Sequence, residues 1–290
     1  MNSFTKSKFS LFAPAKVNLG LKILGKRPDG YHEIRSLFVP LSIGDRIDFE
    51  VLKGGWAGTC DHSDVPMGEG SLVERGFRYA ARRLGFDGGL SVRIEKEIPL
   101  GAGLGGGSTD AAAVMRAVER ITGRSIPEGD YPEIAYKLGA DVPFFLREGA
   151  KWVEGIGEKV TPVSGMPPLH LLLVNPGVSI STKWVYSELK INPLTSPGTT
   201  ASFPRAFGSV KVLLPYLTND LESVVLPRFP VVDEIKNLLI TLGVDAALMS
   251  GSGSTVFGLF SDPIKRDEAL EAFRREYPQW WICAAHSGVV

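Results

Sequence analysis

The sequence predicts an α+β protein with two domains. Segments with the two-residue period of strands and segments with the helical period follow one another without strict alternation, which favours α+β over a parallel α/β sheet. A chain of 290 residues is long enough for two modest domains. The segment TPVSGMPP, residues 161–168, is rich in Pro, Gly and Ser and differs in composition from the apolar strand that follows it. We therefore predict one domain at 1–165 and another at 166–290.

The predicted strands rest on alternating apolar and polar residues. In LFAPAKVNLGLKI, residues 11–23, Val17 and Leu19 fall on one face, and Lys16 and Asn18 fall on the other. Further extended segments are expected at 31–40, 45–52, 90–98, 170–174, the end of 249–260, and 281–285.

The predicted helices combine the helical period with capping residues. The helix 71–84 begins at Ser71, and Gly85 follows its last apolar residue. Other helices are expected at 110–121, 131–138, 231–242 and 267–277, and after Ser181 or Thr182 as the cap. The segments 53–70 and 191–204 are rich in Gly, Pro and polar residues and are expected to be loops.

Composition excludes several classes of function. Lys and Arg total 32 and Asp and Glu total 32, so bulk charge does not favour a nucleic acid partner. No segment approaches the roughly 20 uncharged apolar residues of a membrane span, and the first residues lack the apolar core of a signal peptide. Cys60 and Cys283 lie far apart without Cys or His at ligand spacing, which argues against a disulfide framework or a zinc site. We expect a cytoplasmic protein.

The glycine stretch PLGAGLGGGSTDAAAV, residues 99–114, contains the spelling G-x-G-x-x-G from Gly101 to Gly106. A dinucleotide fold needs a buried strand before it and an acidic residue about 20 residues later, after a second strand. Here a strand with a polar face precedes the glycines, and a predicted helix follows them. A P-loop needs Gly-Lys-Ser/Thr, whereas Ser108 directly follows Gly107. A flexible connector is the remaining simple alternative.

The residues after the glycines argue against a mere connector. Ser108, Thr109 and Asp110 are good N-cap residues at the head of an Ala-rich helix. A glycine loop that runs into a helix N-terminus presents backbone N–H groups and the positive end of the helix dipole, and glycine lets a phosphate approach closely. We therefore predict an anion site for nucleotide phosphates.

This stretch resembles the phosphate-loop motif of the GHMP kinase superfamily, Pro-x-Gly-x-Gly-Leu-Gly-Ser/Gly-Ser-Ser/Gly-Ser/Ala. The resemblance implies a two-domain GHMP kinase fold, with a ribosomal protein S5 domain 2-like N-terminal domain for ATP binding and catalysis and a ferredoxin-like C-terminal domain for substrate binding. It also implies ATP and Mg²⁺ as cofactors, with the metal ligands unassigned and Ser108 and Asp110 as candidates. The implied ATP-binding residues are Pro99, Leu100, Gly101, Ala102, Gly103, Leu104, Gly105, Gly106, Gly107, Ser108 and Thr109.

The segment APAKVNLGLKILGKRPDGYHEI, residues 13–34, would by itself indicate an ordinary strand followed by a turn. It resembles the N-terminal motif of the 4-diphosphocytidyl-2-C-methyl-D-erythritol kinase family, which belongs to the GHMP superfamily. The Asp-Gly-Tyr-His segment distinguishes this family from the related kinases. The resemblance implies that Lys16 assists catalysis. It also implies a substrate site lined by Asn18, Tyr31, His32 and Phe38.

Asp141 lies in the apolar segment LGADVPFFL, residues 138–146. A carboxylate in such a setting is either a capping or turn residue or a functional group. The segment resembles the family motif Gly-x-Asp-Val-Pro-Phe, which implies that Asp141 is the catalytic acid/base.

Two later segments complete the resemblance. NPGVSISTKWVYSEL, residues 175–189, would alone indicate a capped helix with a buried aromatic residue. The resemblance implies instead that Thr182 contacts the substrate and that Tyr186 stacks on cytosine opposite Tyr31. MSGSGSTVFGLF, residues 249–260, resembles the third superfamily motif, in which Gly251 and Gly253 allow close backbone approach.

One position departs from the family pattern. The family usually has Asn-Leu where the first long helix begins, whereas this chain has Ser71-Leu72. An adenine contact from this position is therefore not implied.

The function implied is ATP-dependent phosphorylation of the 2-hydroxyl of 4-diphosphocytidyl-2-C-methyl-D-erythritol, giving ADP and the 2-phosphate, in non-mevalonate isoprenoid precursor biosynthesis. The alternatives are another GHMP small-molecule kinase, of the homoserine or mevalonate type, and a catalytically silent nucleotide-binding sensor. The sensor would be expected to lose Lys16 or Asp141, and both are present. We expect a small-molecule substrate as partner, neither nucleic acid nor membrane, and a monomer or weak homodimer.

Overall fold

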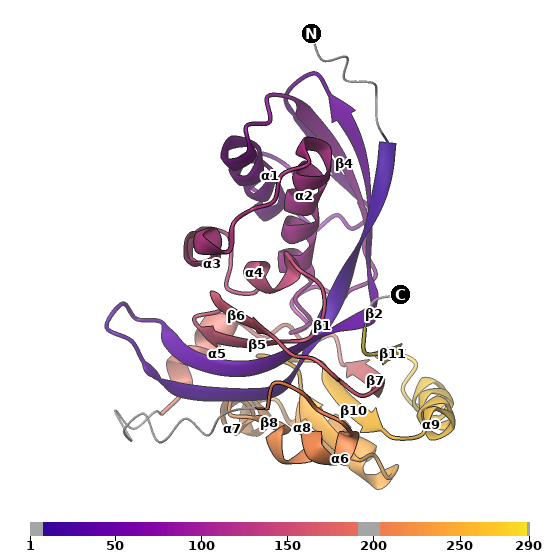
Figure 1. The fold of residues 1–290 in the computed structure, drawn as a ribbon. Helices are drawn as coiled ribbons and strands as arrows, with labels where there is room; N and C mark the ends of the chain where they lie inside the picture. The colour runs from indigo at the N-terminus through magenta and orange to yellow at the C-terminus, as the bar shows by residue number, and fades with distance from the viewer. Residues whose placement is uncertain (1–7, 191–203, 289–290) are drawn as a thin grey trace. The chain divides into compact units, whose positions relative to one another are not determined.

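A computed structural model describes residues 8–190 and 204–288, which form two compact units (Figure 1). The first unit comprises 8–15, Ile43–Ile98 and Gly105–Glu148, and the second comprises Lys16–Ser42, Pro99–Leu104, 149–190 and 204–288. The strands β1 (Lys8–Lys26) and β2 (His32–Leu52) contribute residues to both. The predicted domain division at residue 165 is a different partition of the chain and stays a prediction.

The sheet of the first unit is built on β4 (Gly89–Glu95), which pairs antiparallel with β2 and parallel with β3 (Trp56–Cys60). The predicted alternation in this strand is confirmed, because Leu90, Val92 and Ile94 are buried and Arg93 is exposed. The two predicted strands 31–40 and 45–52 form the single strand β2. The loop predicted for 53–70 is wrong at β3, since this short strand forms by backbone pairing with β4 and has little apolar pattern of its own.

The helices α1 (Leu72–Leu84) and α2 (Gly106–Thr122) pack against each other in the first unit. The predicted ends of α1 are confirmed, because the Ser71 side chain accepts a hydrogen bond from the Glu74 N–H and Gly85 adopts φ +66°. A Cβ at Gly76 would lie 3.1 Å from the Ala111 carbonyl oxygen, so glycine permits the close helix approach.

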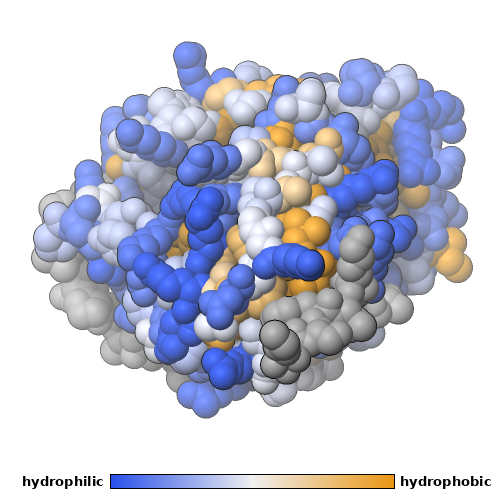
Figure 2. All heavy atoms as spheres, turned by 90° about the horizontal axis from the view of Figure 1, so that it is seen from above, coloured by the Kyte–Doolittle hydropathy of each residue, from blue (hydrophilic) through white to orange (hydrophobic). Residues whose placement is uncertain are grey.

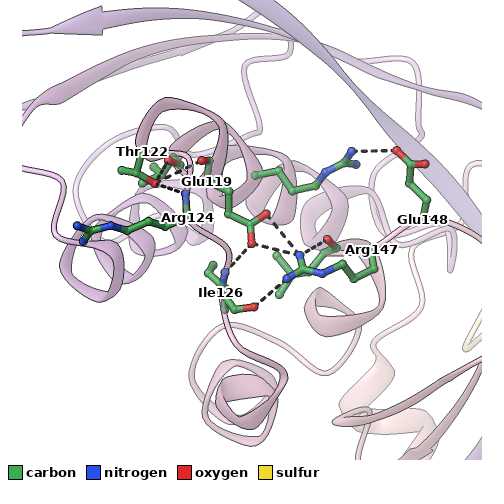
Figure 3. Close-up of polar contacts among 9 residues, drawn as sticks. Glu119, Thr122, Arg124, Ile126, Arg147 and Glu148 are labelled. Carbon is green, nitrogen blue, oxygen red and sulfur yellow. Dashed lines mark hydrogen bonds and ion pairs between the residues drawn. The ribbon is translucent and has the colours of Figure 1, made fainter. Parts of the chain in front are cut away.

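The polar network of Figure 3 joins the two ends of the segment that contains the short elements after α2. These elements are η1 (Glu128–Asp130), α3 (Tyr131–Lys137), predicted at 131–138, and α4 (Val142–Phe145). Nη1 of Arg147 donates to Oε1 of Glu119 at 3.1 Å and Nη2 donates to the carbonyl of Ile126 at 2.8 Å. The same Glu119 oxygen accepts the N–H of Ile126 at 2.7 Å. This network ties Arg147, the second residue after α4, to the C-terminal half of α2.

The second unit contains a four-stranded antiparallel sheet in the order β11 (Trp281–His286), β7 (His170–Asn175), β10 (Val256–Phe260), β9 (Ala246–Met249). Helix α8 (Pro230–Thr241) precedes β9, and α9 (Pro263–Glu276) connects β10 to β11. This β-α-β-β-α-β order is ferredoxin-like, as predicted. The predicted strands and helices at 170–174, 231–242, 267–277 and 281–285 are confirmed within a few residues.

The other strands of the second unit extend from β1 and β2. Residues of β1 pair in parallel with β8 (Thr218–Asn219), and residues of β2 pair antiparallel with β5 (Lys151–Gly155), which pairs with β6 (Lys159–Pro162). The remaining helices are α5 (Thr182–Glu188), α6 (Val210–Leu213), η2 (Leu214–Tyr216) and α7 (Glu222–Arg228). The predicted loop 191–204 lies, except for Pro204, outside the described residues.

The predicted α+β class is confirmed by these two units. The face drawn in Figure 2 is mainly hydrophilic, with apolar side chains gathered in smaller patches. Within residues 8–190 and 204–288, no helix has the length and hydropathy that crossing a bilayer would need.

Candidate active site

Lys16 and Asn18 share one face of β1 in the second unit, as predicted, but this face is covered rather than open to water. Lys16 is 3% exposed and Asn18 is 2% exposed. The backbone N–H of Lys16 donates to the carbonyl of Leu104 at 3.0 Å. The predicted proximity of this strand to the glycine stretch is therefore confirmed for the part of the stretch that ends at Leu104.

The ammonium group of Lys16 is held by neighbouring side chains. Its Nζ donates to Oδ1 of Asn18 at 2.6 Å and lies 4.6 Å from the ring centroid of Phe38. Nδ2 of Asn18 donates in turn to Oγ of Ser36 at 2.9 Å. Because Asn18, Ser36 and Phe38 are themselves buried, the position of the lysine head is fixed by the strands β1 and β2.

The glycine-rich turn between β9 and β10 packs on the same segment. Oγ of Ser250 donates to the carbonyl of Gly103 at 3.0 Å, and the N–H of Thr255 donates to the carbonyl of Ala102 at 3.3 Å. A Cβ at Gly251 would lie 3.3 Å from Oδ1 of Asn18 and 3.5 Å from Nζ of Lys16. A Cβ at Gly253 would lie 2.7 Å from the Met249 sulfur. The predicted close backbone approach at both glycines is confirmed.

The start of α2 differs from the prediction. The helix begins at Gly106 rather than Asp110, with Gly105 as its N-cap at φ +78°. Ser108, Thr109 and Asp110 therefore lie in the first turns and do not cap the helix. The reason is that the left-handed Gly105 turns the chain into the helix early, so that the Thr109 N–H already donates to the Gly105 carbonyl at 2.9 Å.

This early start determines which groups form the predicted anion site, which we call the phosphate cradle. The N–H groups of the first helical residues, Gly106, Gly107 and Ser108, have no acceptor one turn earlier in the helix. Because the N-cap is a glycine, no side chain caps them. Such a glycine-capped helix start is suited to bind phosphate oxygens.

A buried charge cluster that the sequence analysis missed lies beside this helix start. Nζ of Lys96 donates to Oδ2 of Asp110 at 2.8 Å and also to Oδ2 of Asp45. Burial raises the pKa of Asp110 to about 7, against the influence of Lys96 and with that of the Asp45 carboxylate. No sequence signal singles these residues out, because Asp45 and Lys96 stand among other charged residues and Asp110 lies within an Ala-rich helix.

Asp141 occupies the N-cap position of α4 in the first unit, but its side chain makes no cap hydrogen bond. The alternative of a capping carboxylate is therefore not supported. Asp141 is half-buried and precedes four buried residues, Val142–Phe145. A Cβ at Gly139 would lie 3.7 Å from Oγ of Ser108, so the chain just before Asp141 approaches the first turn of α2. Lys16, the other predicted catalytic residue, is described in the second unit.

The predicted substrate residues His32 and Tyr186 meet in the second unit, with ring centroids 5.1 Å apart and planes tilted by 40°. Burial, and secondarily Lys26, lowers the pKa of His32 below its usual value. Ser181 caps α5 by accepting the N–H of Trp184, and Oγ1 of Thr182 lies 2.8 Å from Oγ of Ser252. Tyr31 is 42% exposed, and its predicted position opposite Tyr186 stays a prediction.

Comparisons with known proteins identify the family of this chain. The family model described as GHMP kinases N terminal domain matches residues 71–149, and the model described as GHMP kinases C terminal matches residues 205–279. The chain is 44% identical to the 4-diphosphocytidyl-2-C-methyl-D-erythritol kinase of Syntrophotalea carbinolica, over 87% of this chain and 90% of that protein. It is 42% identical to the protein of the same name from Geobacter sp. strain M21, over 96% and 98%.

Solved structures give the same assignment. A crystal structure of 4-(cytidine 5'-diphospho)-2C-methyl-D-erythritol kinase matches with a TM-score of 0.77 and 33% identity, over 97% of this chain and 100% of that one. The fold is thus that of a GHMP-type small-molecule kinase. The chain belongs to the 4-diphosphocytidyl-2-C-methyl-D-erythritol kinase family within the GHMP kinases. This confirms the predicted resemblance, and membership implies ATP as the phosphoryl donor.

Proposed function

We propose that the protein transfers a phosphoryl group from ATP to the 2-hydroxyl of 4-diphosphocytidyl-2-C-methyl-D-erythritol, a step of non-mevalonate isoprenoid precursor biosynthesis. The observation that carries this proposal is the joint presence of Lys16, the Asp-Gly-Tyr-His segment 29–32 and Asp141 in a chain that is 42% identical to kinases named for this substrate over 96% of its length.

The phosphates of ATP would bind at the glycine stretch. The left-handed glycines at 101, 103 and 105 let the backbone approach a phosphate chain, and the N–H groups of Gly106, Gly107 and Ser108 supply donors at the positive end of α2. The proposed ATP-binding segment is Pro99–Thr109, as the sequence predicted. Phosphoryl transfer depends mainly on such alignment and charge stabilisation.

Asp141 and Lys16 would carry the catalytic roles. Asp141 would accept or orient the proton of the attacking hydroxyl, and its half-buried place at the start of α4, before four buried residues, supports that role. Lys16 would stabilise the charge that develops during transfer, and the contacts of its Nζ with Asn18 and Phe38 fix where that charge lies. Preorganised charges of this kind cost no reorganisation during the reaction.

The cytidyl group would be recognised in the second unit. Tyr186 and Tyr31 would stack on the two faces of cytosine, and His32 would hydrogen-bond its edge. The lowered pKa of His32 favours the neutral ring, which carries one donor and one acceptor nitrogen. Asn18, Phe38 and Thr182 complete the proposed substrate-binding set.

The proposed Mg²⁺ would neutralise charge on the transferred phosphates. Among the described residues, no group of three or more His, Cys, Asp or Glu is placed to hold a metal ion, and the Asp110 carboxylate is bound to Lys96. We propose that ATP phosphates and water supply most of the ligands of the magnesium ion. We assign no protein ligand to it.

We extend the proposal to the roles of the two domains, the cellular location and the oligomeric state of the protein. Residues 1–165 would form the ATP-binding and catalytic domain and would also supply the proposed substrate contacts from β1 and β2, and residues 166–290 would form the substrate-binding domain, with one family-model match on each side of this boundary. We also propose that the kinase acts in the cytoplasm as a monomer or weak homodimer.

The two alternatives have less support. The similarity to homoserine kinase from Cytophaga hutchinsonii, with a TM-score of 0.75 and 20% identity over 100% of this chain and 96% of that one, concerns the fold alone. A silent sensor would be expected to have lost Lys16 or Asp141, and this chain keeps both.

The test is ADP release by the purified protein with a panel of the cytidyl substrate, homoserine and mevalonate. Faster turnover of either of the last two would refute the proposed substrate. Asp141→Asn should lower turnover at least about 100-fold and leave nucleotide binding intact. Asp87→Asn, at an exposed carboxylate of the same unit, is the matched control and should keep full activity.

A further inference from the structure

Three charged side chains are buried together behind the start of α2 in the first unit, and we call them the charge cluster Asp45–Lys96–Asp110. The side-chain exposures are 0% for Asp45, 3% for Lys96 and 2% for Asp110. Nζ of Lys96 contacts both carboxylates. Oδ1 of Asp45 accepts the N–H groups of Glu97 at 2.8 Å and Ile98 at 2.9 Å.

The charge cluster touches the backbone of the phosphate cradle. Residues 96–98 directly precede the glycine stretch, and Asp110 lies about one turn after Gly106 in α2. A Cβ at Gly106 would lie 3.1 Å from Cγ2 of Ile98 and 3.4 Å from Nζ of Lys96. The cradle residue Gly106 therefore packs directly on the lysine that joins the two carboxylates.

Lys96 also balances charge at this place. With both carboxylates ionised, the cluster carries one negative charge more than positive, and Oδ1 of Asp110 has no hydrogen-bond partner among the described residues. Loss of Lys96 would leave two buried carboxylates close to a site for anionic phosphates. Like charges at short range in a poorly solvated site repel strongly.

We propose that Lys96 is a positioning residue for the nucleotide. It holds Asp45 and Asp110 together so that Gly106 and its neighbours keep the orientation of their N–H groups, and its charge prevents the carboxylates from repelling the phosphates. This role rests on the proposed binding of ATP at the cradle. Lys96 is not required to touch ATP or the second substrate.

The test measures ATP and ADP binding to the full chain by isothermal titration calorimetry, without the second substrate. Lys96→Met should raise both dissociation constants about tenfold, since one cation near the phosphates is lost. The KM for ATP should rise in parallel, while the KM for the cytidyl substrate and kcat stay within about twofold of wild type. Lys96→Arg should recover part of the ATP affinity.

Asp110→Asn is the matched control, because its amide oxygen still accepts from Lys96 while one negative charge is removed. ATP should bind this variant as tightly as wild type or tighter. The double variant Lys96→Met/Asp110→Asn should bind ATP several times more tightly than Lys96→Met alone. An equally weak double variant would overturn the role of charge.

Unchanged ATP affinity in a folded Lys96→Met variant would overturn the whole proposal, as would equal losses for ATP and the cytidyl substrate. If circular dichroism finds Lys96→Met unfolded, the ATP affinity of the double variant is compared with that of Asp110→Asn instead. Equal ATP affinity of those two variants would refute the role of Lys96. Because nucleotide binding is measured alone, a failure of the proposed cytidyl activity would leave this test intact.

Discussion

Oδ1 of Asn18 accepts a hydrogen bond from Nζ of Lys16 at 2.6 Å, while Nδ2 of the same amide donates to Oγ of Ser36 at 2.9 Å. Only a side chain with both an acceptor and a donor makes these two contacts at once. Asn18 therefore links the proposed catalytic lysine on β1 to the neighbouring strand β2.

Replacing Asn18 by Leu should impair catalysis by misplacing Lys16. We expect kcat/KM to fall about tenfold and the free energy of unfolding to fall by about 1–3 kcal/mol, because buried polar groups lose a partner. Steady-state kinetics and urea unfolding measure the two effects. Ser36→Ala removes the far partner and keeps the contact to Lys16, so it should spare kcat. Full activity of Asn18→Leu would contradict this role.

Gly103 should tolerate no side chain. Its φ is +76°, and a Cβ would lie 2.1 Å from the Ser250 carbonyl oxygen. Gly103→Ala should therefore lower the free energy of unfolding by more than about 2 kcal/mol and weaken ATP binding. Gly123→Ala is the control, because Gly123 has a similar φ of +66° and no atom lies within 4 Å of the position that a Cβ would take there. It should cost about 1 kcal/mol, and equal losses in the two variants would argue against the steric explanation.

The predictions that proved right from sequence depend on local chemistry. Ser71 and Gly85 define the ends of α1 because capping and left-handed termination involve residues within one turn. The period of β4 is visible because one face meets the core and the other does not. The glycine stretch indicates a phosphate site because the geometry of a helix start is itself local.

The parts that sequence did not reveal depend on contacts between distant segments. Asp45 and Lys96 are 51 residues apart, and no periodicity predicts that they meet. The polar face of β1 is buried where the distant turn at Gly251 lies against Asn18 and Lys16, which the alternation cannot indicate. The early start of α2 could not be predicted from the sequence, because glycine is unfavourable inside a helix and Ser108–Asp110 have side chains typical of a helix cap.

Tyr186 should contribute to substrate affinity through its ring. Tyr186→Leu should raise the KM for the cytidyl substrate about tenfold, since stacking of a base on an aromatic ring stabilises binding by about 1–3 kcal/mol. Tyr186→Phe keeps the ring and the contact face toward His32 and should stay within about twofold of wild type. The KM for ATP serves as an internal reference that neither variant should change. A Tyr186→Leu enzyme with normal substrate KM would exclude the stacking role.

Asp110 should make stability depend on pH in a specific direction. Burial raises the pKa of its carboxyl to about 7, compared with about 4 in an unfolded chain. Between these values the folded state holds a proton that the unfolded state has released. The stabilising contribution is therefore complete below about pH 4 and is lost as the pH rises through about 7.

Asp110→Asn removes this titration while preserving shape and the acceptor for Lys96. The free energy of unfolding of Asp110→Asn minus that of wild type should become more positive by over about 1 kcal/mol between pH 5 and pH 8. Urea unfolding at each pH unit measures it, and Asp87→Asn, at an exposed site, should give a much flatter difference. A constant difference for Asp110→Asn would mean that this carboxyl stays ionised when buried, in which case the charge cluster carries one excess negative charge at every pH of the series.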